Sequence, residues 1–199
     1  MDNAEFFSRH FQVQPVMAIF RGQSPDRTVE LCTLAWNLGI ELVEIPVQSP
    51  NATPSLHAAI AEARTRGKII GAGSVTTIKQ LIEVTQMGAA FTVAPGLDDD
   101  VARESARLHV PHLPGVATAT EITRAVRQGF RWLKAFPAAQ LGTGWIEAHR
   151  GPFPGVKFVA TGGISASNAR QFLAAGCGAV SLGSAFTSES TLAFLDHLA

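Results

Sequence analysis

The feature of this 199-residue chain that most constrains its fold is a regular alternation between short apolar runs and longer amphipathic segments. The apolar runs lack clean period-two alternation and are bounded by Gly, Pro or Ser. Runs of this kind are typical of strands buried on both faces of a parallel sheet. We therefore predict strands at Val16–Arg21, Glu41–Val47, Lys68–Val75, Ala90–Pro95, His112–Ala117, Arg131–Pro137, Lys157–Gly162 and Ala179–Gly183.

The segments between these runs have the spacing of amphipathic helices, as in Thr28 to Leu38. Helix starts are indicated by Ser24-Pro25-Asp26, Thr53-Pro54 and Ser165-Ala166-Ser167. Glycines shortly before the next strand indicate helix ends, at Gly39, Gly67, Gly88, Gly129 and Gly176. The pattern therefore predicts a crossover helix between consecutive strands.

Eight strands joined by helices can form either a closed barrel or an open doubly wound sheet. Eight regular units without a long insertion favour the closed (β/α)8, or TIM, barrel. The chain is shorter than the ~250 residues typical of that fold, so the loops must be short. We find no linker or break in composition, and predict one domain over residues 1–199 with a short helix at about residues 2–11.

Composition narrows the class of protein. Hydrophobic residues make up 46% of the chain and charged residues 16%, which indicates a globular protein with a sizeable core. The 16 basic and 16 acidic residues balance, so a nucleic acid is not expected as the main partner, whereas a small anionic ligand is compatible. Cys32 and Cys177 lie in apolar helical contexts and are predicted to be buried free thiols.

No segment approaches the ~20 apolar residues that a membrane-spanning helix requires, and the first ten residues do not resemble a signal peptide. The expected location is the cytoplasm, without membrane attachment. The six histidines show no ligand spacing at predicted strand ends, so no metal site is expected. Neither a complete Gly-x-Gly-x-x-Gly fingerprint nor a P-loop with its lysine is present, and a nucleotide is not suggested.

Lys134 is the lysine best placed for chemistry. The active sites of such barrels lie at the carboxyl ends of the strands. Lys68 and Lys157 stand at strand beginnings and Lys79 lies on a predicted helix, whereas Lys134 lies within a strand. Burial lowers the pKa of an amine and makes it available as a nucleophile. The alternative is a structural lysine paired with a carboxylate in the barrel core.

Glu44 is the acidic residue placed well inside a predicted strand. Its strand and that of Lys134 stand opposite each other in an eight-stranded barrel, and their side chains can converge over its mouth. An amine facing a carboxylate suits carbonyl chemistry, because the amine forms an imine and the carboxylate moves protons. A plain ion pair of Glu44 with Lys134 or Arg21 is equally compatible with the sequence.

Glycine-rich turns follow the last two predicted strands. Gly162 and Gly163 open one turn, and Gly183-Ser184 follows the other strand. Backbone amides in such turns approach anions, and the loops after strands seven and eight of barrels frequently bind phosphate. Simple tight turns are the alternative. Arg21, at the end of the first strand, could hold a carboxylate through a bidentate fork or form a structural ion pair.

Short motifs in this order and spacing resemble the 2-keto-3-deoxy-6-phosphogluconate (KDPG) and 4-hydroxy-2-oxoglutarate aldolase family of class I aldolases. The resemblance extends from about Pro15 to Ser184 and rests on Ala18-Ile19-Phe20-Arg21-Gly22, Val43-Glu44-Ile45-Pro46, Gly71-Ala72-Gly73-Ser74-Val75, Ala94-Pro95-Gly96, Pro114-Gly115-Val116-Ala117-Thr118, Leu133-Lys134-Ala135-Phe136-Pro137, Thr161-Gly162-Gly163-Ile164 and Leu182-Gly183-Ser184.

This resemblance implies that Lys134 forms the Schiff base and that Glu44 transfers protons. It also implies that Arg21, Ser74 and the Pro95 turn surround the pyruvyl carboxylate, and that the two glycine turns, with Gly162, Gly163, Gly183 and Ser184, hold a phosphate. The implied partners are a phosphorylated sugar acid and pyruvate. The implied assembly is a homotrimer that needs no cofactor.

Two positions depart from the family pattern. Ser74 stands where threonine is usual, and the hydroxyl is kept. Gln48 stands where the gluconate-type enzymes place arginine, and Glu44-Ile45-Pro46-Val47-Gln48-Ser49-Pro50 is more similar to the phosphogalactonate branch. The sugar epimer is therefore left open between gluconate and galactonate types.

Two rival functions are also compatible with these residues. One is a phosphate-binding barrel enzyme without a Schiff base, such as an epimerase or a relative of thiamine-phosphate synthase. The other is a non-catalytic sugar-phosphate sensor that keeps the pocket.

Overall fold

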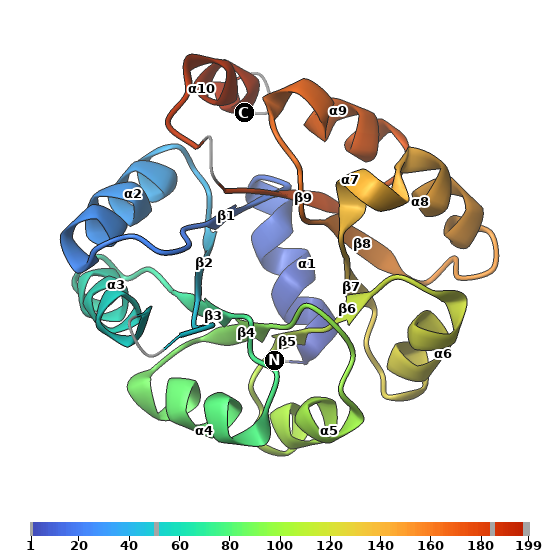
Figure 1. The fold of residues 1–199 in the computed structure, drawn as a ribbon, viewed down its shortest axis with the longest axis horizontal. Helices are drawn as coiled ribbons and strands as arrows, with labels where there is room; N and C mark the ends of the chain where they lie inside the picture. The colour runs from blue at the N-terminus through green and yellow to red at the C-terminus, as the bar shows by residue number, and fades with distance from the viewer. Residues whose placement is uncertain (1, 50–51, 184–185, 197–199) are drawn as a thin grey trace.

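The computed structural model describes residues 2–49, 52–183 and 186–196. These residues form one parallel sheet of short strands, drawn as arrows in Figure 1. The strands are β1 (Val16–Ile19), β2 (Leu42–Pro46), β3 (Gly71–Gly73), β4 (Phe91–Val93), β5 (His112–Leu113), β6 (Gly115–Val116), β7 (Trp132–Ala135), β8 (Lys157–Ala160) and β9 (Ala179–Leu182).

The strand order closes the sheet into a barrel. It runs β5-β4-β3-β2-β1-β9-β8-β7-β6, and β5 and β6 at its two ends are separated only by Pro114. They are two halves of the strand predicted at His112–Ala117, one half pairing with β4 and the other with β7. The strand divides at Pro114 because proline cannot donate to a ladder, although its carbonyl accepts from Lys134 N at 2.9 Å. The predicted (β/α)8 barrel is confirmed.

Helices surround the strands, as Figure 1 shows in the view down the shortest axis. The helices are α2 (Pro25–Asn37), α3 (Thr53–Thr65), α4 (Ile78–Met87), α5 (Asp99–Arg107), α6 (Ala119–Arg127), α7 (Ala138–Leu141), α8 (Thr143–Arg150), α9 (Ala166–Ala174) and α10 (Glu189–Asp196).

The helices begin and end largely at the residues that the sequence indicated. Ser24 caps α2 by accepting from Arg27 N, and Ser165 forms a capping box with Asn168. The cap of α3 is Ala52, so Thr53 lies inside the helix instead. All the glycines predicted to end helices have left-handed φ angles, from 62° at Gly67 to 105° at Gly88.

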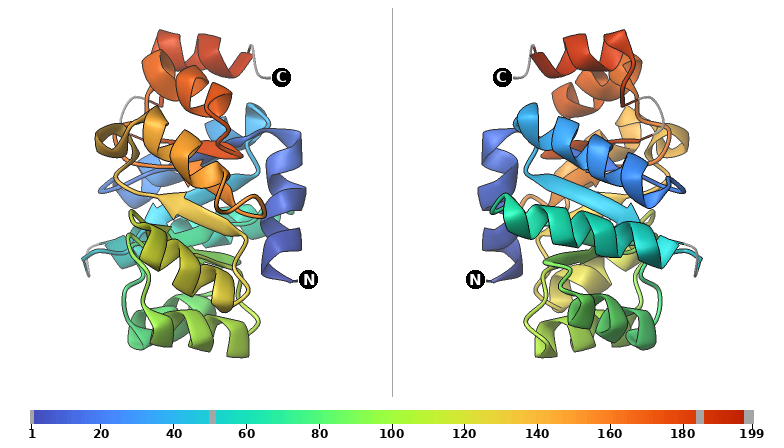
Figure 2. Two further views of the ribbon diagram at one scale, coloured as in Figure 1. Left: turned by 90° about the vertical axis from the view of Figure 1, so that its right-hand side faces the viewer. Right: turned by 90° about the vertical axis from the view of Figure 1, so that its left-hand side faces the viewer.

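The first helix, α1 (Asn3–Val13), covers the end of the barrel at which the strands begin. In Figure 2 it stands at one edge of the molecule, across the strand ends. Phe6, Phe7 and Phe11 are buried there, and Ser8 Oγ accepts a hydrogen bond from Trp132 Nε1 at 3.0 Å. Because α1 closes this end, the opposite end remains for a ligand.

Strand residues alternate between two packing layers. Inside the barrel, Met17, Leu42, Phe91, Trp132 and Val159 pack together with α1. Their neighbours along each strand pack outward against the helices, as do Val43 on β2, Leu133 on β7 and Phe158 on β8. The sequence did not show this period because both faces are apolar and buried. The alternation decides which polar side chains point into the barrel.

Candidate active site

Strand alternation directs Lys134 and Glu44 into the barrel. Lys134 lies two residues after Trp132, which packs inside, and Glu44 lies two residues after Leu42. Both side chains are buried, with 4% of Lys134 and 1% of Glu44 exposed. The strands β2 and β7 are separated by four steps in either direction around the barrel when β5 and β6 are counted as one strand. The two side chains therefore enter the interior from opposite walls.

Glycines on β3 provide the space that Glu44 occupies. A Cβ added at Gly73 would lie only 1.6 Å from Glu44 Oε1, and one at Gly71 would lie 2.3 Å from the Phe91 ring. Real Cβ atoms do not approach other atoms so closely, so β3 accepts no side chain at either inward position. The carboxylate of Glu44 thus lies across Gly73, the residue paired with Pro46 in the neighbouring strand.

Burial shifts the pKa of each group in the direction that favours its neutral form. It lowers the pKa of Lys134, an effect that the charge of Glu44 opposes and that of Arg21 reinforces. It raises the pKa of Glu44, against the charges of Lys134 and Arg21. Lys134 Nζ also lies 5.0 Å from the centroid of the Phe136 ring. The amine is therefore neutral, and nucleophilic, at lower pH than an exposed lysine.

The carboxylate of Glu44 accepts no hydrogen bond from the described residues. Neither of its two oxygens has a hydrogen-bond partner among residues 2–49, 52–183 and 186–196. A buried carboxylate without donors is costly, and such groups usually meet water or a ligand. A plain structural ion pair would instead show a direct hydrogen bond to Lys134 or Arg21. The geometry leaves both oxygens available for proton transfer.

A cavity of about 560 Å³ opens at the carboxyl ends of β1, β7, β8 and β9. It brings together five of the residues predicted from the sequence: Arg21, Lys134, Gly162, Gly163 and Gly183. Gly162 and Gly163 have φ angles of 93° and 71°, in the region that favours glycine. Ser184, predicted at the same turn as Gly183, lies outside the described residues.

Three predicted residues do not line this cavity. Glu44 interacts electrostatically with Lys134 and Arg21, two residues that do line the cavity. Ser74 follows Gly73 with a left-handed φ of 58°, and β3 ends at Gly73, two residues before the predicted end at Val75. Pro95 lies in the turn after β4, where its carbonyl faces Gly115: a Cβ added at Gly115 would meet Pro95 O at 2.2 Å. The roles predicted for Ser74 and Pro95 stay predictions.

Several cavity residues were not singled out from the sequence. Thr161 and Ser181, at the ends of β8 and β9, are buried, and their hydroxyl oxygens are 2.9 Å apart. Gln23 and Arg27 reach the cavity from the segment after β1. Thr161 stands one residue before Gly162 and could have been found from the glycine motif. Ser181 and Arg27 carry no local signal, because only the closed barrel brings them to Lys134.

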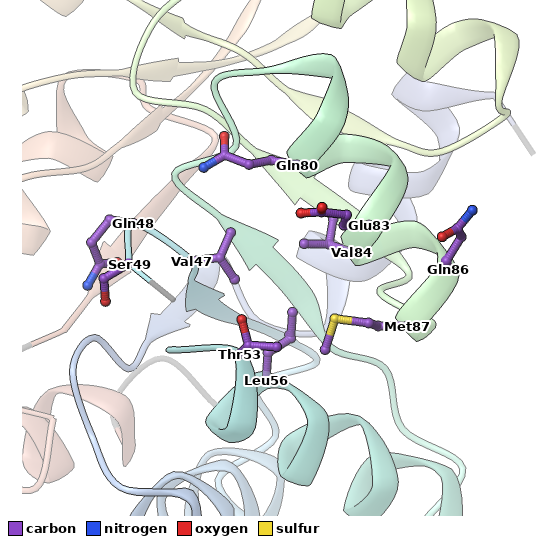
Figure 3. Close-up of a pocket in the computed structure, with 10 residues that line it drawn as sticks. All are labelled: Val47, Gln48, Ser49, Thr53, Leu56, Gln80, Glu83, Val84, Gln86 and Met87. Atoms are coloured by element: carbon purple, nitrogen blue, oxygen red, sulfur yellow. The ribbon is translucent and has the colours of Figure 1, made fainter. Parts of the chain in front are cut away.

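A second hollow, of about 610 Å³, lies between α3 and α4 (Figure 3). Apolar side chains of Val47, Leu56, Val84 and Met87 line it, and Gln48 lies at one end on the segment after β2. Its described lining includes no lysine, and Glu83 is its one charged residue. This hollow is similar in size to the cavity at Lys134, and its described lining offers no amine for imine formation.

Two further observations concern ions and membranes. Within the described ranges, no group of three or more His, Cys, Asp or Glu side chains is placed to hold a metal ion. None of the described helices combines the length and apolar character needed to cross a membrane. Cys32 and Cys177 are free and buried, as predicted, and burial raises the pKa of each thiol to about 12.

The arrangement suits carbonyl chemistry on an anionic ketone. A buried amine supplies a nucleophile, a buried carboxylate can move protons, and the cavity around the amine is lined by Arg21, Arg27 and glycine turns. The comparisons agree with this geometry. A family model described as KDPG and KHG aldolase matches residues 8–197. The chain belongs to this aldolase family. It is a carbon–carbon lyase.

Curated relatives of this aldolase cover most of its length. The 2-dehydro-3-deoxy-6-phosphogalactonate aldolase of Escherichia coli K12 is 34% identical over 171 residues, which are 85% of this chain and 83% of the relative. The 2-dehydro-3-deoxy-phosphogluconate aldolase of Pseudomonas aeruginosa is 34% identical over 170 residues, 83% of this chain and 74% of the relative. Equal identity to both does not decide between the two sugar epimers.

A solved structure links the family to covalent chemistry. KDPG aldolase from Legionella pneumophila, with pyruvate captured as a covalent carbinolamine intermediate, superposes with a TM-score of 0.82. It is 28% identical, and the match covers 94% of this chain and 93% of that chain. A carbinolamine forms when an amine adds to a carbonyl, so a class I mechanism is supported for this aldolase and the rival barrel functions are not favoured.

Proposed function

We propose that this aldolase cleaves a 2-keto-3-deoxy-6-phospho sugar acid into pyruvate and glyceraldehyde 3-phosphate through a Schiff base on Lys134. The observation that carries the proposal is the buried amine of Lys134, which lines a cavity and whose pKa is lowered by burial. The carboxylate of Glu44, which interacts with this amine electrostatically, has no hydrogen-bond partner in the described residues. The relatives that act on phosphogalactonate and phosphogluconate acids supply the substrate class.

The reaction begins when Lys134 Nζ attacks the C2 ketone, and loss of water from the carbinolamine gives a protonated imine. Glu44, directly or through a water molecule, takes the proton of the C4 hydroxyl. The C3–C4 bond then breaks, its electron pair moves toward the imine nitrogen, and glyceraldehyde 3-phosphate leaves. Protonation of the enamine at C3 and attack of water on the imine release pyruvate and free Lys134.

The substrate is oriented by its two anionic ends. Arg21, Ser74 and the Pro95 turn surround the carboxylate next to the ketone. The turns that contain Gly162, Gly163, Gly183 and Ser184 hold the phosphate, in keeping with the glycine-lined part of the cavity. Gln48 favours the galactonate epimer, because its amide replaces the arginine of gluconate-type enzymes. A side-by-side cleavage assay on both epimers tests that preference.

The test of the covalent step is reductive trapping. Incubation with pyruvate and cyanoborohydride is expected to reduce the imine and leave one 1-carboxyethyl group per chain, and peptide mass spectrometry is expected to locate it on Lys134. Lys79, whose side chain is 85% exposed, serves as the internal control for nonspecific modification. A chain that cleaves substrate while Lys134 stays unmodified would contradict the proposal and favour a barrel enzyme without a Schiff base.

We also propose that the aldolase assembles as a homotrimer in the cytoplasm. One structural relative, 32% identical with a TM-score of 0.80, belongs to a protein cage designed by fusing symmetric oligomeric domains. Light scattering during size-exclusion chromatography is expected to give three times the 21.1 kDa chain mass. A mass of one or two chains at micromolar concentration would contradict the trimer.

A further inference from the structure

Three basic side chains line the cavity at Lys134. Its described lining includes Arg21, Arg27 and Lys134, and neither aspartate nor glutamate. Such a lining gives the cavity a positive potential and favours an anionic ligand. The substrate of the proposed function carries a carboxylate and a phosphate. Arg21 and Arg27 lie at different parts of the cavity and would bind different ones of these two groups.

Arg21 belongs to the inner, carboxylate end. Its charge acts on both Lys134 and Glu44, whereas Arg27 is not among the charges that shift their pKa values. Arg27 lies in the first turn of α2, and Leu31, one turn further, lines the same cavity. This face of α2 therefore borders the cavity farther from the reacting pair than Arg21 does.

Gly183, Phe186 and Thr187, which come after β9, line the neighbouring part of the cavity. The strands β1 and β9 are hydrogen-bonded neighbours, and a Cβ added at Gly183 would lie 3.4 Å from Ile19 O. The rings of Phe20 and Phe186 meet edge to face at 5.1 Å, which packs the two segments together. Arg27 and Gly183 both line this cavity.

The backbone of Arg27 is fixed, whereas its side chain is lightly held. Ser24 Oγ accepts from Arg27 N at 3.3 Å, and Ser55 Oγ donates to Gln23 O at 2.8 Å. The guanidinium contacts only Glu30 among the ion pairs of the described residues, at 2.7 Å, and the two side chains are 47% and 64% exposed. Exposed pairs of this kind contribute little to stability. A phosphate can replace Glu30 at little cost.

We propose that Arg27 is a specificity-determining residue that binds the substrate phosphate beside the glycine turns and sets the preference for phosphorylated substrates. A charge-assisted hydrogen bond from a planar guanidinium suits a phosphate group. The proposal rests on the aldolase function proposed above, and adds to it a cation that the glycine turns by themselves do not supply.

The experiment compares two aldehydes in the condensation with pyruvate: glyceraldehyde 3-phosphate and unphosphorylated glyceraldehyde. Arg27→Gln is expected to lower kcat/KM for glyceraldehyde 3-phosphate by roughly 10- to 100-fold, mainly through KM, in the range of a lost charge-assisted hydrogen bond. The value for glyceraldehyde is expected to change by less than about 2-fold, and Arg27→Lys to recover part of the preference.

The matched control is Arg103→Gln, because Arg103 forms an exposed pair with Asp100 three residues away on α5, as Arg27 does with Glu30 on α2. This control is expected to leave both aldehydes unaffected. Equal losses with both aldehydes in Arg27→Gln, or no loss with either, would overturn the role of Arg27. If the unmodified enzyme joins neither aldehyde to pyruvate, the proposed function itself fails, which is a separate outcome.

Discussion

Lys134→Met is expected to lower kcat for sugar-acid cleavage by roughly 10⁵-fold or more, the scale on which enzymes lose activity when a covalent nucleophile is removed. Methionine fits the buried site by length but cannot form an imine. Without the charge of Lys134, which lowers the pKa of Glu44, the carboxyl group takes up a proton more readily. The measurements are single-turnover cleavage and pyruvate trapping, and both signals are expected to disappear.

The fold is expected to survive this change, with a lower unfolding temperature than that of the parent. Removing one of two coupled buried charges is destabilising, and uptake of a proton by Glu44 offsets part of that cost. Lys79→Met, at a largely exposed lysine of α4, is the matched control and should retain full activity. Cleavage by folded Lys134→Met at even a tenth of the parental rate would contradict the Schiff-base role.

Glu44→Gln is expected to lower kcat by about 10² to 10⁴, the usual contribution of a general acid–base group. The amide keeps the size of the side chain but cannot accept the C4 hydroxyl proton. Pyruvate trapping on Lys134 is expected to persist, because the amine remains. Glu83→Gln, at an exposed glutamate of α4, is the control and should leave kcat unchanged.

The same variant has a pH signature. The charge of Glu44 raises the pKa of Lys134, so its removal lowers that pKa further below the ordinary value. The neutral amine then predominates from a lower pH, and the extent of trapping with pyruvate should reach its plateau at lower pH than in the parent. A midpoint that moves to higher pH, or does not move, would show that the two groups are not coupled.

Gly73→Ala tests the position of Glu44 without changing its chemistry. The added Cβ would lie 1.6 Å from Glu44 Oε1, so the carboxylate has to move. We expect kcat to fall toward the Glu44→Gln value while pyruvate trapping on Lys134 persists. Gly155→Ala is the control, because a Cβ there meets no atom within 4 Å. Unchanged kcat in Gly73→Ala would mean that the placement of Glu44 over Gly73 is not needed.

Much of the secondary structure could be predicted from short stretches of sequence. The apolar runs, the Ser24 and Ser165 caps and the glycines that end helices depend on neighbouring residues, and these features appeared where they were predicted. The exact extent of each strand was less accessible. Pro114 divides the predicted fifth strand into β5 and β6, and the third strand ends before Ser74, whose φ is 58°.

The order of apolar and amphipathic segments was enough to predict the alternation of strands and helices, and to place Lys134 and Glu44 inside strands. It could not decide whether Lys134 and Glu44 point inward, because residues on both faces of these strands are apolar and give no period. Only the closed barrel settled that, by packing Trp132 and Leu42 inside and so directing the residues two positions later toward the mouth. Only the tertiary structure shows that Glu44 occupies the space over Gly73 and that Arg27 lines the cavity. Each feature brings together elements that are distant in the chain.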